Sequence, residues 1–332
     1  MAFARGMIAA LAALMLVGAA EPPPPPELAA YFKDGEFQPG DYAWARGMFA
    51  DATPEQKALF DALTAWNVEC RRISGERTRR ELAELGIELP DPTPDYSACP
   101  VILPQFDYDR PYAEFEAAMR EAKPIAQTYI AAARLAQERA MGNAATFGEA
   151  LTARTISEQM FRVALGWGRE PLADVPELSP DGLTMLRSLL MAAGSRADWA
   201  NTAWLKERVA AEGWPKISEV GEKGASAAWL LTQHADRDPV FQLRALRLME
   251  PLLAEGEVSK RNYAYLYDRA MLKLAGKQRY GTQWGGCEGG VRQLQPLEDE
   301  VRLDELRAEM EIEPIADYAR MMDQMYGGCG AG

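Results

Sequence analysis

The only histidine of the 332-residue chain, His234, lies in the stretch WLLTQHADRDPVFQ, between a glutamine and two aspartates. Imidazole titrates near neutral pH, so a histidine beside a carboxylate is suited to general acid/base catalysis. Asp236, Asp238 or Asp268 could supply that carboxylate. We therefore consider His234 and Asp268 as candidate catalytic residues, with Asp268 orienting the ring.

A structural role for the same histidine is equally consistent with the pattern. On a helical projection His234 lies at the margin of the apolar face, and Gln233 and Arg237 lie on the polar side. A half-buried ring there could bond to Gln283, to a tyrosine hydroxyl or to a backbone carbonyl, and so tie neighbouring elements together.

The motifs of well-known catalytic sites are absent from the sequence. It contains no G-x-S-x-G, S-x-x-K, H-E-x-x-H, G-x-x-x-x-G-K or G-x-G-x-x-G. With one histidine, a metal site would depend on carboxylates and would suit magnesium or calcium better than zinc. We expect no metal and no other cofactor.

A second group of polar residues surrounds Gly281 in the stretch KQRYGTQW. A glycine there lets another chain or a ligand approach the backbone closely. These side chains could bind a small polar ligand or a peptide strand, or they could satisfy buried polar groups. The candidate binding residues are Gln233, Arg269, Gln278, Tyr280 and Gln283.

The stretches EGWPKISEVGEKGASAAWLLTQHADRDPVFQ, GEVSKRNYAYLYDRAMLKLAGKQRYGTQW and PLEDE resemble a bacterial family known as domain of unknown function 6624. The resemblance covers roughly residues 195–325 and implies no activity. Cys287, inside the glycine-rich loop, departs from the family pattern. The positions that carry the resemblance are Trp214, Gly221, Gln233, His234, Asp268, Arg269, Gln278, Tyr280, Gly281 and Gln283.

The first twenty residues, MAFARGMIAALAALMLVGAA, have the features of a secretory signal peptide. One cation precedes an apolar run of about 11 residues, too short for the ~20 that span a bilayer, and small residues follow it. We expect cleavage near Ala19 or Ala20 and a periplasmic or secreted protein with no transmembrane segment. The prolines of EPPPPPE begin a spacer and extended lead-in over residues 21–52.

Export favours disulfides for the four cysteines, none of which has C-x-x-C spacing. Of the three pairings, we favour the two local ones, because each pair then falls within one half of the chain. These pairs are Cys70 with Cys99 and Cys287 with Cys329.

With a net charge of −13 and no basic run except RTRR at 77–80, the sequence does not indicate the basic face that nucleic-acid binding requires. We therefore expect no nucleic-acid partner. The partner that remains is an unidentified small polar ligand or an envelope protein.

Helical periodicity dominates the rest, so the sequence predicts a mainly α protein with bundle-like halves at 53–168 and 181–326 and a tail at 327–332. One β-hairpin is predicted near 278–297, with strands at 278–284 and 291–297 around a glycine-rich loop. One long helix is predicted to begin near residue 53. A second covers 111–141 and is interrupted or kinked at Pro124. The other predicted helices cover 144–165, 181–193, 198–211, 224–236, 238–256, 259–276, 301–310 and 314–325.

Two functions follow from these residues. The first is an exported helical binding or scaffolding module with a polar cluster around His234 that includes Asp268, Arg269, Tyr280 and Gln283. The second is a cell-envelope hydrolase or isomerase in which His234 is the general acid/base. A structure distinguishes them, because a catalytic His234 must open onto a cleft and lie within hydrogen-bond reach of a carboxylate.

Overall fold

The computed structural model describes residues 23–33, 36–37, 42–89, 99, 101–166 and 177–329. Within these residues the protein is mainly α-helical, as predicted, with two small antiparallel sheets. The predicted signal peptide and most of the stretch between the two predicted halves, 169–180, lie outside the described residues. None of the described helices is long and apolar enough to cross a membrane.

The first long helix, α1 (Pro54–Glu84), begins as its sequence predicts. The Thr53 hydroxyl accepts a hydrogen bond from the Gln56 N–H, and the Gln56 side chain bonds back to the Thr53 N–H. This reciprocal capping box satisfies two N–H groups that the helix leaves without internal partners. The buried face of α1 includes Leu63, Trp66 and Cys70.

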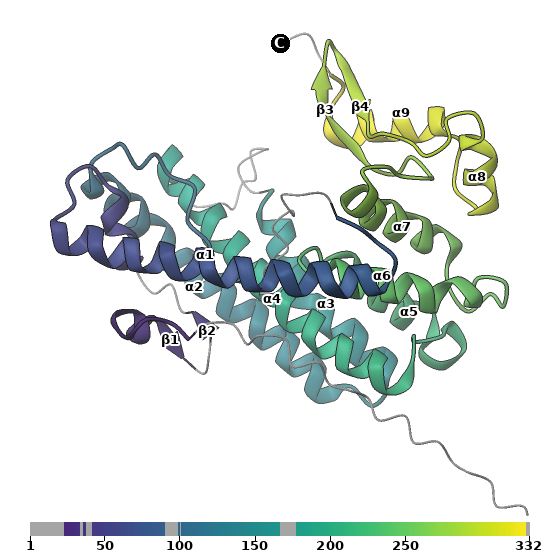
Figure 1. Cartoon of the computed structure of the whole chain (residues 1–332), viewed down its shortest axis with the longest axis horizontal. Helices are drawn as coiled ribbons and strands as arrows, with labels where there is room; N and C mark the ends of the chain where they lie inside the picture. The colour runs from purple at the N-terminus through teal and green to yellow at the C-terminus, as the bar shows by residue number, and fades with distance from the viewer. Residues whose placement is uncertain are drawn as a thin grey trace, which may run out of the picture.

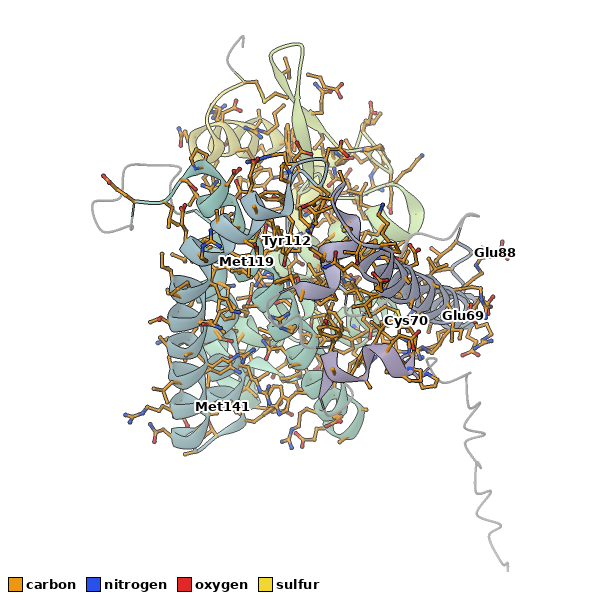
Figure 2. All side chains as sticks on the ribbon, turned by 90° about the vertical axis from the view of Figure 1, so that its left-hand side faces the viewer. Glu69, Cys70, Glu88, Tyr112, Met119 and Met141 are labelled. Atoms are coloured by element: carbon orange, nitrogen blue, oxygen red, sulfur yellow. A yellow bond between two sulfur atoms is a disulfide. The ribbon has the colours of Figure 1, made fainter. Side chains whose placement is uncertain are left out.

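Three further helices, α2 (Tyr112–Asn143), α3 (Phe147–Ala164) and α4 (Pro180–Glu212), pack together behind α1, which crosses in front of them (Figure 1). The helix α2 continues through Pro124, where we expected a kink or interruption. Figure 2 shows α2 from a perpendicular direction, with Tyr112, Met119 and Met141 along its length and Cys70 on α1.

The prediction of two helices at 181–193 and 198–211 was wrong, because α4 is continuous through this region. The gap between the two predicted helices begins at Gly194. In the structure it is buried in α4, and a Cβ at that position would lie 3.6 Å from the Phe161 Cβ of α3. This distance is an ordinary van der Waals contact, so Gly194 packs against α3 within the helix and does not end it.

Beyond α4, the chain forms α5 (Ile217–Gln233), α6 (Pro239–Met249), a 3₁₀ turn (Glu250–Leu252) and α7 (Lys260–Ala275). Asp238 and Ser259 cap α6 and α7, each by accepting a backbone N–H, and Gly276 ends α7 with a left-handed conformation at φ 69°. The helix α5 begins before the predicted residue 224 and bends at Gly221, and it ends before the predicted residue 236.

The predicted hairpin is present, but its strands are displaced along the chain. Strand β3 covers Trp284–Glu288 and β4 covers Val291–Leu294, so part of the glycine-rich stretch is strand and the turn is at Gly289–Gly290. Residues 278–283 form no strand, and backbone bonds at Gln278 and Gln283 and the side chains of Asp268 and Gln278 hold them in place. Two short helices, α8 (Leu303–Glu309) and α9 (Ile315–Tyr326), complete this end of the molecule, beyond α7 (Figure 1).

The lead-in that we expected to be extended is partly folded. It forms two 3₁₀ turns, Pro26–Tyr31 and Ala43–Met48, and a minimal hairpin of β1 (Phe32–Lys33) with β2 (Glu36–Phe37). The prediction failed here because it relied on the prolines at the start of the segment, whereas the apolar and aromatic side chains that follow them are buried and so fold the segment. The buried ones are Leu28, Phe37, Tyr42, Trp44, Ala45 and Phe49.

Two main groups of buried side chains form the core. One lies among the lead-in, α1, α2 and the adjoining parts of α3 and α4, and includes Phe161 and Met185. The other lies among α5, α6 and α7, together with Leu151 of α3 and Leu205 of α4. Since α3 and α4 contribute to both groups, these two helices connect the N-terminal and C-terminal parts of the structure.

The two disulfides have the predicted pairing. Cys70 on α1 is bonded to Cys99, and Cys287 on β3 is bonded to Cys329 after α9. The described residues contain no free cysteine. The second bond attaches the end of the chain to the hairpin.

Loss of the first disulfide should weaken the N-terminal part. Cys70 and Cys99 are separated by 29 residues, so their bond should contribute about 3 to 4 kcal/mol by restricting the unfolded chain. We expect the double variant Cys70→Ala, Cys99→Ala to lose free energy of unfolding in this range, as measured by urea denaturation. A variant as stable as the oxidised wild type would contradict a stabilising role for this bond.

Candidate active site

A close approach of α3 and α5 positions the candidate site. A Cβ added to Gly224 of α5 would lie 2.7 Å from the Gly148 Cα of α3, so only glycines allow this crossing. Glu158 follows Gly148 by ten residues, and His234 follows Gly224 by ten residues. Both spacings correspond to about 15 Å of helix, so the two helices run side by side in the same direction and bring Glu158 to His234.

Glu158 and His234 form the centre of the site. The Glu158 side chain is fully buried, and its Oε2 lies 2.9 Å from Nδ1 of His234, whose side chain is 14% exposed. The two atoms are at hydrogen-bond distance, although the contact lacks the alignment of an ideal hydrogen bond. His234 lies at the C-terminal cap of α5, where its backbone N–H bonds to the Leu230 carbonyl.

Arg162 holds the buried carboxylate in place. One turn after Glu158 on α3, its guanidinium donates to that carboxylate and also to Asp198 of α4, with 2.9 Å between Nη2 and Oδ2 of Asp198. Burial raises the pKa of Asp198 to about 6, against the opposing charge of Arg162. Asp198 therefore titrates close to neutral pH, next to the histidine.

His234 and Asp198 line a cavity of about 460 Å³, which is within the size range of small-molecule sites. Because Nδ1 of His234 is buried against Glu158, Nε2 is the ring nitrogen left to react with a ligand in this cavity, which His234 lines. The walls come from α1, from α4 and from the loop between α5 and α6. The lining residues are Ser74, Arg77, Thr78, Glu81, Ser195, Asp198, Trp199, Thr202, Ala203, Lys206, His234, Ala235, Asp236, Arg237, Asp238 and Val240.

The two aspartates that follow the histidine are engaged by other groups. Asp236 is bonded to Arg269 and Lys273 of α7. Burial acts to raise the pKa of Asp236, but the bonds and charges of these two cations outweigh it and lower the pKa to about 2. Asp238 accepts the Phe241 N–H at the start of α6 and pairs with Lys206.

Asp268, the predicted partner of His234, holds the hairpin region instead. Its buried carboxylate accepts the backbone N–H groups of Arg279, Tyr280 and Thr282 at 2.8 to 2.9 Å. Burial raises the pKa of Asp268, and these three hydrogen bonds act against that rise. The carboxylate that the structure places against His234 is Glu158.

The candidate binding residues fall into two places. Gln278, fully buried, bonds through its amide to backbone atoms of Gln283 and Gln295, and Tyr280 is buried nearby. Among the described residues, neither these nor Gln283 lines the cavity of His234.

The other two candidate binding residues lie closer to the cavity. Arg269 reaches its edge through Asp236. Gln233, expected on the polar face of α5, is 8% exposed because the helix ends there and packs on Gln242.

Glu158, Asp198 and His234 could also hold a metal ion, since each offers a ligand atom and these atoms lie within 4.8 Å of one another. The donor set of two carboxylates and one imidazole is chemically suitable for a divalent cation. However, the Arg162 guanidinium already contacts both carboxylates. Arg162 therefore supplies the positive charge that a metal ion would otherwise supply.

Sequence reasoning missed Glu158, Arg162 and Asp198. A signal for Glu158 was available, because it lies seven residues from both Leu151 and Leu165, on the apolar stripe of its helix. A carboxylate in such a stripe must be paired when it is buried. We placed Asp198 at the start of a separate predicted helix, where an acidic side chain is common because it interacts favourably with the helix dipole.

Comparison with known proteins supports the resemblance found in the sequence. A model described as "Family of unknown function (DUF6624)" matches residues 180–329. No curated protein and no solved structure matches the chain. Asp198 and His234 lie inside the matched segment, whereas Glu158 and Arg162 lie before it.

The crossing of α3 and α5 can be tested by widening it. We expect Gly224→Ala to reduce the free energy of unfolding by about 1 to 3 kcal/mol, because the added methyl group meets the α3 backbone. The control is Gly75→Ala on α1, where a Cβ has open space and alanine should be neutral or stabilising by up to about 1 kcal/mol. Equal stabilities of the two variants in urea denaturation would contradict the close approach.

Asp198 should contribute a characteristic dependence of stability on pH. Its pKa is raised in the folded state, so its contribution is complete below pH ~4 and is lost as pH rises through about 6. Two pKa units correspond to roughly 3 kcal/mol. We expect the stability of wild type relative to Asp198→Asn to fall by about this amount between pH 4 and pH 7, as measured by urea denaturation. A difference that stays constant or rises with pH would contradict the raised pKa.

Proposed function

We propose that the protein is an acid–base enzyme of the hydrolase or isomerase class, which acts on a small polar substrate in the cavity at His234. The observation that carries this proposal is the pairing of Nδ1 of His234 with a buried carboxylate at 2.9 Å, while the ring lines a cavity of about 460 Å³. A histidine oriented in this way can take up and return a proton at Nε2.

The residues around His234 have distinct roles in this proposal. Nε2 of His234 accepts a proton from a water molecule or from the substrate, and returns it to the leaving group or to another substrate atom. Glu158 orients the ring and stabilises the imidazolium that forms, as the carboxylate of a catalytic triad does. Arg162 positions Glu158 through their ion pair.

Asp198 is the second proton-transfer group in this proposal. With a pKa of about 6 it is partly protonated near neutral pH, and it lines the same cavity as the histidine. Two groups with different environments in one site can act as acid and base in the same turnover. Thr202 also lines the cavity, but its hydroxyl donates to the Asp198 carbonyl.

The binding-module interpretation placed a polar cluster beneath the hairpin. Asp268 and Gln278 use their polar atoms to bond the backbone of the hairpin region, which favours a structural role for that cluster. The ligand contacts in our proposal therefore come from the cavity between α1, α4 and α6.

We also propose that the protein works outside the cytosol, in the periplasm or in the medium. Two disulfides support this location, because such bonds persist in oxidising compartments. The signal-peptide features of residues 1–20 support it independently.

Turnover should depend on the histidine and on its buried partner. We expect a panel of esters, amides, phosphoesters and epimerisable acids to include a substrate on which His234→Gln lowers kcat by roughly 100- to 10,000-fold. Glu158→Gln should lower it by roughly 100-fold, whereas Glu76→Gln, an exposed glutamate of α1, should have no effect. Turnover that survives in His234→Gln would contradict the proposal.

A chemical probe tests the same residue without a substrate. Diethylpyrocarbonate reacts with unprotonated, accessible imidazole nitrogens, and this chain offers only one histidine. We expect peptide mass spectrometry of a protein without a histidine tag to find a carbethoxy group on His234, and none at position 234 in His234→Gln. A folded protein whose histidine resists the reagent would show that Nε2 does not face the cavity.

A further inference from the structure

We infer that the protein has a second binding site, which takes a small organic ammonium cation in a cavity beside α5. The volume of this cavity is about 360 Å³, within the size range of small-molecule sites. Among the described residues, none lines both this cavity and the cavity of His234. The second site therefore goes beyond the proposed function and does not depend on it.

The walls of this second cavity come mainly from α5 and from the start of α7. Glu222 and Trp229 line it from α5, and their spacing of seven residues places them on the same face of that helix. Ile217 and Ser259 line it from the beginnings of α5 and α7. The Ile217 N–H bonds to the Glu257 carbonyl at 3.0 Å, so a backbone hydrogen bond holds these two parts of the wall together.

Two tryptophans and two buried apolar side chains line the same cavity. Trp214 is 5% exposed, Met249 and Val258 are also buried, and Trp229 packs against the same group of core residues. Within the described part of the chain, neither tryptophan ring stacks on another aromatic ring or holds a cation. Tryptophan attracts cations more strongly than the other aromatic side chains, because the faces of its ring carry partial negative charge.

The carboxylate of Glu222 gives the cavity a negative charge. Of the described residues that line the cavity, Glu222 alone is charged, and none of the described residues forms an ion pair with it. The next residue, Lys223, is exposed and lies outside the lining. The two cations at the start of α7, Lys260 and Arg261, are paired with glutamates that also lie outside the lining.

Tryptophan rings together with one carboxylate form a combination that suits an alkylated ammonium group. The apolar carbons of such a ligand pack on the aromatic and aliphatic wall, and its positive charge is attracted both by the rings and by Glu222. A neutral ligand of the same shape gains only the first of these contributions. An anionic ligand would be repelled by the carboxylate.

Choline is the probe for this inference, and its uncharged carbon isostere, in which a tert-butyl group replaces the trimethylammonium group, is the matched comparison. We expect choline to raise the melting temperature of the oxidised protein saturably at constant ionic strength. The isostere should bind about tenfold more weakly in isothermal titration calorimetry, because it lacks the charge that the rings and the carboxylate attract. Absence of a saturable response to choline, or equal affinity for the isostere, would overturn the inference.

Variants of two lining residues locate the binding. Trp229→Leu should weaken choline binding about tenfold, whereas Trp229→Phe, which keeps an aromatic ring, should retain part of the affinity. Glu222→Gln should weaken it roughly two- to fivefold, as expected for loss of an exposed charge pair. The control for the change in net charge is Glu207→Gln, an exposed glutamate of α4 outside the lining.

The exposed position of Glu222 keeps the test decisive if a Trp229 variant does not fold, because Glu222→Gln removes no packed side chain. If choline binds to Glu222→Gln and to every folded Trp229 variant as tightly as to Glu207→Gln, it binds elsewhere and the inference fails.

The second site and the acid–base site can be distinguished experimentally. His234→Gln should keep the full thermal response to choline, and choline should leave the reaction of His234 with diethylpyrocarbonate unchanged, because the two cavities have separate linings. Protection of His234 by choline would place the cation in the first cavity and would overturn the inference.

Discussion

The burial of the Glu158 carboxylate is the constraint on which the rest of the site depends. A charge removed from water is strongly unfavourable unless other groups compensate it. Here Arg162 supplies the cation and His234 supplies a ring nitrogen at 2.9 Å. One guanidinium faces two carboxylates, Glu158 and Asp198, and burial raises the pKa of Asp198 to about 6 despite the charge of Arg162. A proton on Asp198 is therefore favoured up to a pH close to neutral, which is a property that an acid–base site requires.

The same constraint joins the two halves of the chain. Glu158 and Arg162 come from α3, before the segment matched by the family model, whereas Asp198 and His234 lie within that segment. The glycine contact between α3 and α5 fixes the separation of the helices that carry Glu158 and His234. Arg77 on α1 adds a wall of the cavity from the N-terminal part. The cavity is thus a composite of both halves and not a property of the matched segment alone.

Much of the fold could be predicted from the sequence because its signals are local. The Thr53, Asp238 and Ser259 caps, the Gly276 stop and the cysteine spacing each act within a few residues or within one half of the chain. The failures had non-local causes. Gly194, where the gap between two predicted helices begins, is buried against α3, which the local sequence does not indicate, and the partner of His234 lies 76 residues earlier in the sequence, where no spacing rule indicates it. Asp268 was a reasonable candidate by type, but its carboxylate is used by the hairpin backbone.

The protonation of the His234 ring tests the central claim most directly. Because the chain has one histidine, ¹⁵N NMR of a uniformly labelled, untagged protein gives one pair of imidazole nitrogen signals. The pairing with Glu158 predicts that the neutral ring carries its proton on Nδ1 and leaves Nε2 unprotonated, and that Glu158→Gln changes this tautomer balance. A neutral ring protonated on Nε2 in the wild type, unchanged by Glu158→Gln, would contradict the account.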